Sequence, residues 1–331
     1  MNEAKKNRIG IIGAGNIVEM AHLPQLNSRI DTQIVWIVDR DFTRAQRLAK
    51  SYGAQALQVP DFATIDLALL AVPLGARSPF IEAAAAAKVA IYCEKPAARD
   101  QTEHQQLTAR FAPHACAIGL QRRFYPQVAL LRQANERSWF GQLQSVKLLA
   151  CNFNLKSGGA THFAQDVAQA GGGITLESAI HLVDIVLWSC FVQSIHVLKR
   201  AAFAQGLLDF EMRFSADMQS TKSARLVPFT AEISSLRNDP NNGVELHFER
   251  AVLRWNCDAA SPVVLVSDTG NVVLGSQLSS ITASFAECWS AVFEALRTQV
   301  PNASSACHSE ATSALMGQLY QGLASSTEQC T

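Results

Sequence analysis

A lysine and a histidine, far apart in the chain, stand in surroundings suited to hydride-transfer chemistry. Lys95 closes the apolar run VAIYCEKP, and Pro96 follows it directly. At the carboxyl end of a parallel strand, such a lysine would project into the crevice where ligands of doubly wound folds bind, and its ammonium could stabilise a developing alkoxide there. His181 follows a run of three glycines. An imidazole, which titrates near neutral pH, can accept the proton of a substrate hydroxyl.

One helix is predicted to carry His181 together with two acidic residues. Glu177 and His181 are four positions apart in GGGITLESAIHLVD, so an α-helix would place both on the same face. We therefore predict Lys95, His181 and Glu177 as the catalytic residues. Asp184 lies further along the helix. We predict a structural role for it, as acceptor of a hydrogen bond from a neighbouring helix or from the histidine.

A glycine turn near the amino end predicts a dinucleotide site. Gly13 to Val18 follow an apolar run and open a helical stretch. The first glycine permits a tight turn, the second lets the backbone approach a pyrophosphate, and the first helical amides bind that group. Val18 takes the third position, which is usually small, so we expect the helix to stand further from the strand. The predicted cofactor-binding residues are Gly13, Gly15, Asn16 and Ile17.

Asp39 favours NAD as that dinucleotide. It ends the second apolar run, where an acid binds the adenosine ribose hydroxyls and repels the 2′-phosphate of NADP. Arg40 and Arg44 lie beside it, and a guanidinium here could stack on adenine or pair with that phosphate, so NADP stays possible. All three residues are predicted to bind the cofactor. The alternative is an aspartate that caps the following turn, with both arginines solvated.

Short apolar runs alternate with helical stretches over residues 8–120, a pattern that predicts the doubly wound parallel sheet of a Rossmann domain. Helices are expected at 42–53, with Thr43 as its cap and Gly53 as its stop, and at 78–88. The predicted strands are 8–15, 33–39, 67–73, 89–96 and 114–120.

After about residue 140, polar and apolar residues interchange and turn-forming clusters separate the runs. This pattern predicts a large, mostly antiparallel sheet with one exposed face, framed by helices at 173–188, 281–298 and 309–326. The fold class is therefore α/β, with an N-terminal Rossmann domain, 1–120, and a C-terminal α+β domain, 121–331. The predicted strands of the second domain are 143–155, 207–215, 225–236, 243–249, 251–257 and 262–268.

The composition excludes several classes of partner. The chain of 331 residues has 28 basic and 28 acidic side chains and 48% hydrophobic residues, so we expect a soluble protein with no nucleic-acid or membrane partner. Its eight cysteines form no Cys-x-x-Cys pair, and no metal site is predicted. A signal-peptide pattern is missing and no apolar run is long enough to span a bilayer, which predicts a cytoplasmic protein.

Several further motifs occur in one order along nearly the whole chain. His22-Leu23-Pro24 follows the glycine turn, Val72-Pro73 follows a strand, Glu94-Lys95-Pro96 closes another, and Arg122-Arg123-Phe124 opens the second domain. Together with GGGITLESAIHLVD, they resemble the glucose-fructose oxidoreductase / inositol dehydrogenase / MocA family. That family has an EKP signature, often a Thr-Pro-Asn at the second of these places, and a glycine-rich D-x-x-x-H segment.

The resemblance implies an NAD(P)-dependent oxidoreductase that acts on a CH–OH group of a sugar, cyclitol or sugar derivative. It implies that Lys95 contacts both substrate and nicotinamide ribose, often beside a cis Lys-Pro bond, and that Arg123 reaches the nicotinamide edge. It also implies cofactor contacts for Val72, Pro73 and Glu94. Family members commonly associate through the faces of their second-domain sheets, which implies a homodimer or a homotetramer.

Glu177 departs from the family pattern, because an aspartate that binds substrate or orients the histidine usually stands at this place. The extra methylene moves the carboxylate, and reacting groups must be placed to a fraction of an ångström. The residues predicted to contact the substrate are Lys95, Gln121, Asn154, His162, Glu177 and His181.

Three other functions stay open at this point. A relative of this family could keep its NAD bound and cleave glycosides by transient oxidation. An imine reductase would use His181 as proton donor. A non-catalytic, dinucleotide-sensing regulator is the third. The departures at Val18 and Glu177 support it, whereas the presence of Lys95 and His181 argues against it. Nothing in the sequence identifies the substrate, since selectivity lies in loops without a readable code.

Overall fold

The computed structural model describes residues 6–151, 167–275 and 279–323. The chain forms two compact units. The first contains Met1–Ala97, Gln105–Gln121 and Phe285–His308, and the second contains Ala98–His104, Arg122–Ser284 and Ser309–Thr331. Within the described part of the chain, every helix falls short of the length or the hydropathy that a membrane span requires.

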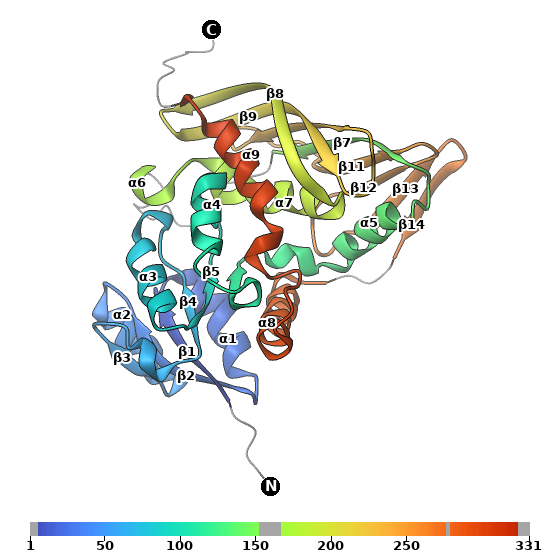
Figure 1. The fold of residues 1–331 in the computed structure, drawn as a ribbon. Helices are drawn as coiled ribbons and strands as arrows, with labels where there is room; N and C mark the ends of the chain where they lie inside the picture. Colours follow the sequence, from blue (N-terminus) through green and yellow to red (C-terminus); the bar gives the residue numbers. More distant parts are fainter. Residues whose placement is uncertain (1–5, 152–166, 276–278, 324–331) are drawn as a thin grey trace. The chain divides into compact units, whose positions relative to one another are not determined.

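The first unit is built on a parallel sheet with the strand order β3-β2-β1-β4-β5-β6 (Figure 1). The order reverses between β1 and β4, and in such sheets ligands bind beside the carboxyl ends of the strands at that point. β4 and β5 are buried along their whole length, as expected of parallel strands covered on both faces. The strands are β1 Asn7–Ile12, β2 Thr32–Val38, β3 Gln55–Leu57, β4 Leu67–Leu70, β5 Ala90–Cys93 and β6 Cys116–Ile118.

Helices connect these strands, and the two helices predicted in this region are confirmed. α2 (Phe42–Tyr52) ends at Gly53, whose φ of 66° is left-handed as predicted for a stop. Its cap is Asp41, which accepts a hydrogen bond from the Arg44 amide, so the expected cap Thr43 is wrong by two positions. The other helices here are α1 Leu23–Asn27, α3 Ser78–Ala86 and the second half of α4 Gln101–Thr108, whose first four residues belong to the second unit.

A late segment of the chain packs with this Rossmann unit. Most of α8 (Ile281–Thr298) and the turn after it belong to the first unit, whereas the predicted boundary at 120/121 placed them in the second domain. The Ile118 amide donates to the Ser304 carbonyl over 3.0 Å, and Trp289 stacks on Tyr92 with ring centroids 4.6 Å apart. Contacts so remote in sequence carry no local signal that a pattern of apolar residues could reveal.

The second unit contains an eight-stranded sheet with the order β14-β13-β12-β11-β7-β10-β9-β8. Only the β10–β7 pair is parallel within it, so the predicted mostly antiparallel sheet is confirmed. Its strands are β7 Leu143–Ala150, β8 Val192–Gln205, β9 Leu208–Ser220, β10 Val227–Ser234, β11 Gly243–Phe248, β12 Val252–Trp255, β13 Val263–Ser267 and β14 Gly270–Leu274.

One face of this sheet packs against helices and the other carries exposed polar side chains. On β10, Phe229, Ala231 and Ile233 are buried while Thr230 and Glu232 are exposed, the alternation of a half-covered strand. The buried side chains form one core with residues of the helices that lie against the sheet in Figure 1. The helices of this unit are α5 Pro126–Glu136, α6 Val167–Ala170, α7 Ile180–Ser189 and α9 Glu310–Tyr320.

Candidate active site

The glycine turn has the geometry that a dinucleotide site requires. Gly13 has φ +101°, and a Cβ atom there would lie 2.5 Å from the Ala71 carbonyl oxygen, so only glycine fits. A Cβ at Gly15 would point into open space, where a pyrophosphate could approach the backbone. The helix after it starts with a π turn, Val18–His22, whose first residue is fully buried. First-turn amides have no partner within their own helix and can therefore bind an anion.

Asp39 is tied to this turn. One of its carboxylate oxygens accepts a hydrogen bond from the Ala14 amide over 2.6 Å, and the other accepts one from the Asp41 amide over 2.8 Å. The capping role considered from the sequence is thus present, and the same contacts fix the carboxylate beside the glycine turn. Arg40 and Arg44 are exposed, and Arg44 lies 3.8 Å from Asp41.

The EKP segment continues from the carboxyl end of β5, as predicted. The Glu94 amide still donates to the Leu70 carbonyl of β4, after which the chain leaves the sheet. The Lys95–Pro96 peptide bond is cis, which confirms the expectation from the family resemblance. Lys95 therefore stands at the edge of the sheet where ligands of this fold class bind.

Arg77, which was not predicted from the sequence, anchors this segment through hydrogen bonds to backbone carbonyls. Its buried guanidinium donates to the carbonyl of Val72 over 2.9 Å and to that of Pro96 over 2.5 Å. The bond to Val72 fixes the loop after β4, and the bond to Pro96 fixes the EKP segment. The only signal in the sequence is a single arginine before an alanine-rich helix, which is not specific.

Glu94 is buried and pairs with His22. The two side chains lie 2.8 Å apart, and the Trp289 indole donates to the other ring nitrogen of His22 over 3.2 Å. Because an indole N–H only donates, Nδ1 of His22 is the acceptor and Nε2 carries the proton that Glu94 accepts. The second carboxylate oxygen of Glu94 accepts from the Lys95 amide over 3.2 Å. This network therefore links α8, the π turn Val18–His22 and the EKP segment.

Replacing Glu94 by glutamine tests this network. Burial raises the pKa of Glu94, but the hydrogen bond from His22 and the charges of Lys95 and Arg77 lower it more, to a net pKa below the ordinary 4.5. Because this pKa is lower in the folded state, the charged carboxylate stabilises the fold at pH values above 4.5. This stability is lost as the pH falls through the folded-state pKa. We expect Glu94→Gln to lower the free energy of unfolding by about 2 kcal/mol at neutral pH.

This loss should shrink as the pH falls below the ordinary value of 4.5, because protonated glutamate and glutamine are then nearly equivalent. Urea unfolding between pH 4 and pH 7 measures it, with the exposed Glu287 of α8 replaced by glutamine as the control. A difference that stays constant or grows in acid would mean that the Glu94 carboxylate is not charged in the folded protein.

In the second unit, Glu177 and His181 lie on one continuous helical segment, as predicted. A π turn, Thr175–Ala179, leads into α7. The Glu177 amide donates to the Gly173 carbonyl over 2.9 Å, and His181 is 7% exposed. π turns are frequent at functional sites, and the two π turns among the described residues follow the two glycine motifs.

Arg123 forms a buried ion pair, and the contact with the nicotinamide that the family resemblance implied stays a prediction. Its guanidinium forms two hydrogen bonds with the Asp184 carboxylate, of 2.7 and 2.5 Å, and both side chains are 1% exposed. Thr312 donates to the same carboxylate over 2.8 Å, and Trp188 stacks on the guanidinium at 4.6 Å. Asp184 thus has the structural role predicted for it, as acceptor of hydrogen bonds from Arg123 and from Thr312 of α9.

The remaining predicted residues divide as follows. Gln121 is buried and is the last residue of the segment Gln105–Gln121 of the first unit. Asn154 and His162 lie outside the described residues. Val72 and Pro73 follow β4 and lead into a 3₁₀ turn. In the described ranges, no three histidine, cysteine, aspartate or glutamate side chains gather as a metal site would require.

The strand order, the glycine turn and the acid after β2 define the first unit as a dinucleotide-binding Rossmann domain. Residues 7–121 match the model of the "Oxidoreductase family, NAD-binding Rossmann fold", the GFO_IDH_MocA family. The match covers the domain in which the EKP and glycine motifs predicted this family, and the family's description names the predicted nicotinamide cofactor.

Curated relatives and solved structures match this chain beyond residues 7–121. An inositol 2-dehydrogenase from Rhizobium meliloti is 25% identical over 59% of this chain and 58% of its own length. The chain spans little more than half the length of such curated relatives. A 3-ketoreductase from Actinomadura kijaniata, solved with NADP, has a TM-score of 0.77 at 14% identity over 96% of this chain and 98% of its own.

An oxidoreductase from Agrobacterium radiobacter, solved with NAD+, L-tartaric acid and magnesium, has a TM-score of 0.79 at 14% identity, with 97% of both chains covered. At such low identities, these two structures establish the fold, which extends through both units. The predicted fold class is thereby confirmed.

Proposed function

We propose that this protein is an NAD(P)-dependent oxidoreductase that transfers hydride between a secondary alcohol of a sugar or cyclitol and the nicotinamide. The observation that carries the proposal is Lys95, which stands at the carboxyl end of β5 in an NAD-binding Rossmann domain. Glu94 and Arg77 hold the chain on either side of it. Such support of a charged group from two sides is typical of a preorganised catalytic residue.

The residues of the first unit fit a nicotinamide dinucleotide. The turn around Gly13 and Gly15 would hold the pyrophosphate, and Asp39 would hold the adenosine ribose. Val72 and Pro73 follow β4 and Glu94 follows β5, and these three residues would contact the dinucleotide near Lys95. When bound, the dinucleotide supplies the hydride acceptor or donor.

The protein's own groups would handle the proton. In the oxidation direction, the substrate C–H bond breaks with its electron pair, and the hydroxyl loses its proton to the imidazole of His181. The ammonium of Lys95 would stabilise the oxygen as negative charge develops on it. Glu177 would bind a neighbouring hydroxyl or orient His181. In the reverse direction, the imidazolium returns the proton to the forming alcohol.

The substrate class rests on the relatives. One is named an inositol 2-dehydrogenase and another a D-glucoside 3-dehydrogenase, so we propose a cyclitol or a glycoside with free ring hydroxyls. The test is the absorbance of reduced nicotinamide after mixing the protein with NAD and, in turn, myo-inositol, glucosides and nucleotide sugars. A regulator would be favoured instead if the protein binds the dinucleotide but none of these compounds reduces NAD and no ketone or imine oxidises NADH.

Product analysis separates the enzymatic alternatives. A glycosidase with transient oxidation would cleave a glycoside with no net change in the dinucleotide. An imine reductase would consume reduced nicotinamide only with imines. Net reduction of NAD that matches the ketone formed is the outcome our proposal expects.

Cofactor preference is expected to follow Asp39. Its carboxylate repels a 2′-phosphate, so kcat/KM should favour NAD over NADP by at least about tenfold. Asp39→Asn keeps an acceptor for the Ala14 amide but removes the charge, and it should reduce that preference. Steady-state kinetics with both cofactors measure the effect. A wild-type preference for NADP would instead assign the site to Arg40 and Arg44.

The association state and the cellular location stay predictions. We propose a homodimer or homotetramer joined through the exposed face of the eight-stranded sheet, and a cytoplasmic protein. Light scattering that gives a monomer at micromolar concentration would contradict the first of these.

A further inference from the structure

The helix that carries Glu177 and His181 begins against a buried carboxylate. Asp209 of β9 is 1% exposed and faces the glycine run from the side of the sheet. Its Oδ1 accepts a hydrogen bond from the Gly173 amide over 3.1 Å. Its Oδ2 accepts from the amide and the hydroxyl of Thr175, over 3.2 and 2.6 Å. The negative charge therefore lies at the amino end of the helix, where the helix dipole stabilises it.

A buried phenol completes this contact. Tyr320 of α9 donates its hydroxyl proton to Asp209 Oδ1. The hydroxyl oxygen of Tyr320 accepts hydrogen bonds from the amides of Gly173 and Leu176 over 3.2 and 3.1 Å. Burial raises the pKa of the Tyr320 phenol well above its ordinary value, so the phenol keeps its proton. Burial also raises the pKa of Asp209, and the hydrogen bonds from Thr175 and Tyr320 offset only part of that rise.

The same two residues explain the last two of the three consecutive glycines here. A Cβ atom at Gly173 would lie 2.2 Å from the Asp209 amide nitrogen, and one at Gly172 would lie 2.7 Å from the Tyr320 ring. Real Cβ atoms do not approach other atoms so closely, hence any side chain would push the helix away from β9 and α9. The glycine run is thus a packing surface for Asp209 and Tyr320.

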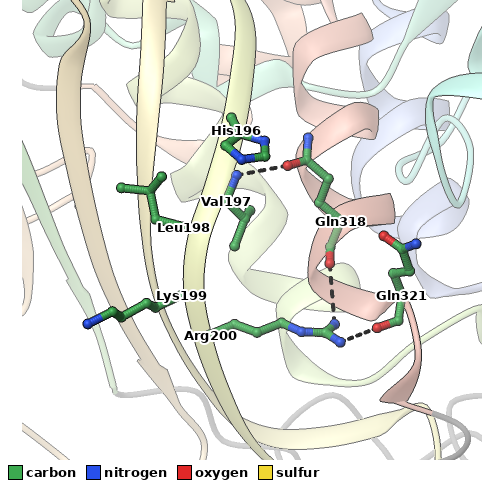
Figure 2. Close-up of a pocket in the computed structure, with 7 residues that line it drawn as sticks. All are labelled: His196, Val197, Leu198, Lys199, Arg200, Gln318 and Gln321. Atoms are coloured by element: carbon green, nitrogen blue, oxygen red, sulfur yellow. Dashed lines mark hydrogen bonds between the residues drawn. The ribbon is translucent and has the colours of Figure 1, made fainter.

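The end of α9, which carries Tyr320, is itself fixed to the sheet. Figure 2 shows Gln318 and Arg200 reaching across between α9 and β8. The Gln318 side chain accepts from the Val197 amide and donates to the Ile195 carbonyl, both over 2.8 Å. The Arg200 guanidinium donates to the carbonyls that end the helix, among them that of Gln321. The hollow of about 380 Å³ beside these contacts contains none of the predicted site residues.

We propose that Asp209 and Tyr320 are positioning residues that set the direction of the His181 imidazole. They would do so by fixing the first turn of its helix to β9 and α9. This inference rests on the proposed function, in which His181 accepts the substrate proton. A turn of helix that lost these bonds could shift by a fraction of an ångström to an ångström, and such a misplacement costs up to about 100-fold in rate.

Tyr320→Phe is the sharpest variant, because it removes one hydroxyl and keeps the ring against Gly172. We expect kcat to fall by about 10- to 100-fold, with the KM for the dinucleotide changed by less than about twofold. Asp209→Asn should act in the same direction. Tyr52→Phe, which removes a phenol from α2 of the first unit, is the matched control and should leave kcat unchanged.

A double-mutant cycle distinguishes positioning from general loss of structure. If Tyr320 acts through His181, then Tyr320→Phe should have almost no effect on the residual rate of a His181→Ala protein. Hydrogen exchange of the amides of Gly173 to Leu176 should also become faster in Tyr320→Phe. An active wild-type enzyme in which the two substitutions multiply, or in which Tyr320→Phe leaves kcat unchanged, would overturn the inference. A wild-type protein that transfers no hydride would overturn the proposed function, and this inference with it.

Discussion

Replacing Lys95 by alanine is expected to lower kcat by about 10²- to 10³-fold, the loss typical when one group that stabilises developing negative charge is removed. The charge on the substrate oxygen develops only on the way to the transition state, so the ground-state complex should suffer less. We expect the affinity for the dinucleotide to fall by no more than about tenfold, the worth of one hydrogen bond. Stopped-flow measurement of nicotinamide reduction gives the rate, and fluorescence titration gives the affinity.

Lys50→Ala provides the control for this experiment, because Lys50 is an exposed lysine on α2 of the same unit. It should leave both quantities unchanged. Equal loss of dinucleotide affinity and of kcat/KM in Lys95→Ala would instead mean that Lys95 serves to bind the cofactor and takes no part in the chemistry.

Replacing His181 by alanine is expected to lower kcat by about 10²- to 10⁴-fold, the range for loss of a general base. The remaining activity should rise with pH, since hydroxide or water must then take the substrate proton. In the wild type, protonation of the imidazole should lower the rate at acid pH, and this fall in rate should be absent from the variant. Added imidazole should restore part of the rate if the vacated space admits it. The pH dependence of kcat/KM, measured with and without imidazole, tests these expectations.

His196→Ala is the matched control for that variant, because His196 is an exposed histidine of the same unit, on β8. Its rate and pH profile should equal those of the wild type. Unchanged rates in both Lys95→Ala and His181→Ala would remove the proposed mechanism, whereas an unchanged pH profile in His181→Ala alone would assign the proton to another group.

Most of the strands could be predicted, because burial on both faces produces continuous apolar runs and burial on one face produces alternation. β8 escaped prediction for a physical reason. Its pairing with β9 shifts register at three places, and each shift breaks the alternation of polar and apolar residues. β14 escaped because it is a short edge strand whose apolar side chains, such as Val272 and Val273, are exposed.

The candidate site shows the same division between local and distant signals. Gly13, Asp39 and Lys95 could be placed from the sequence, since each stands at the end of a strand whose pattern is visible. The partners that hold such residues come from remote parts of the chain. Trp289 meets His22 from α8, and Tyr320 meets the glycine run from α9. For such helix residues, nothing in the neighbouring sequence indicates the contact.

The place of Arg123 in the fold was predicted from motif order, whereas its pair with Asp184 was not. Motif order placed it correctly at the start of the second unit, and the resemblance implied a contact with the nicotinamide. Its buried bidentate pair with Asp184 is a strong, charge-assisted contact of the kind that fixes two helices. The motif therefore located the residue, and its contact with the nicotinamide stays a prediction.

A crystal structure of the protein with NAD and a slowly reacting cyclitol tests the central proposal most directly. Our account predicts that Nζ of Lys95 and a ring nitrogen of His181 both lie within hydrogen-bond distance, about 3 Å, of the same substrate hydroxyl. The carbon that bears this hydroxyl should face the reactive carbon of the nicotinamide. A bound complex in which either group lies beyond the reach of one bridging water would contradict the account.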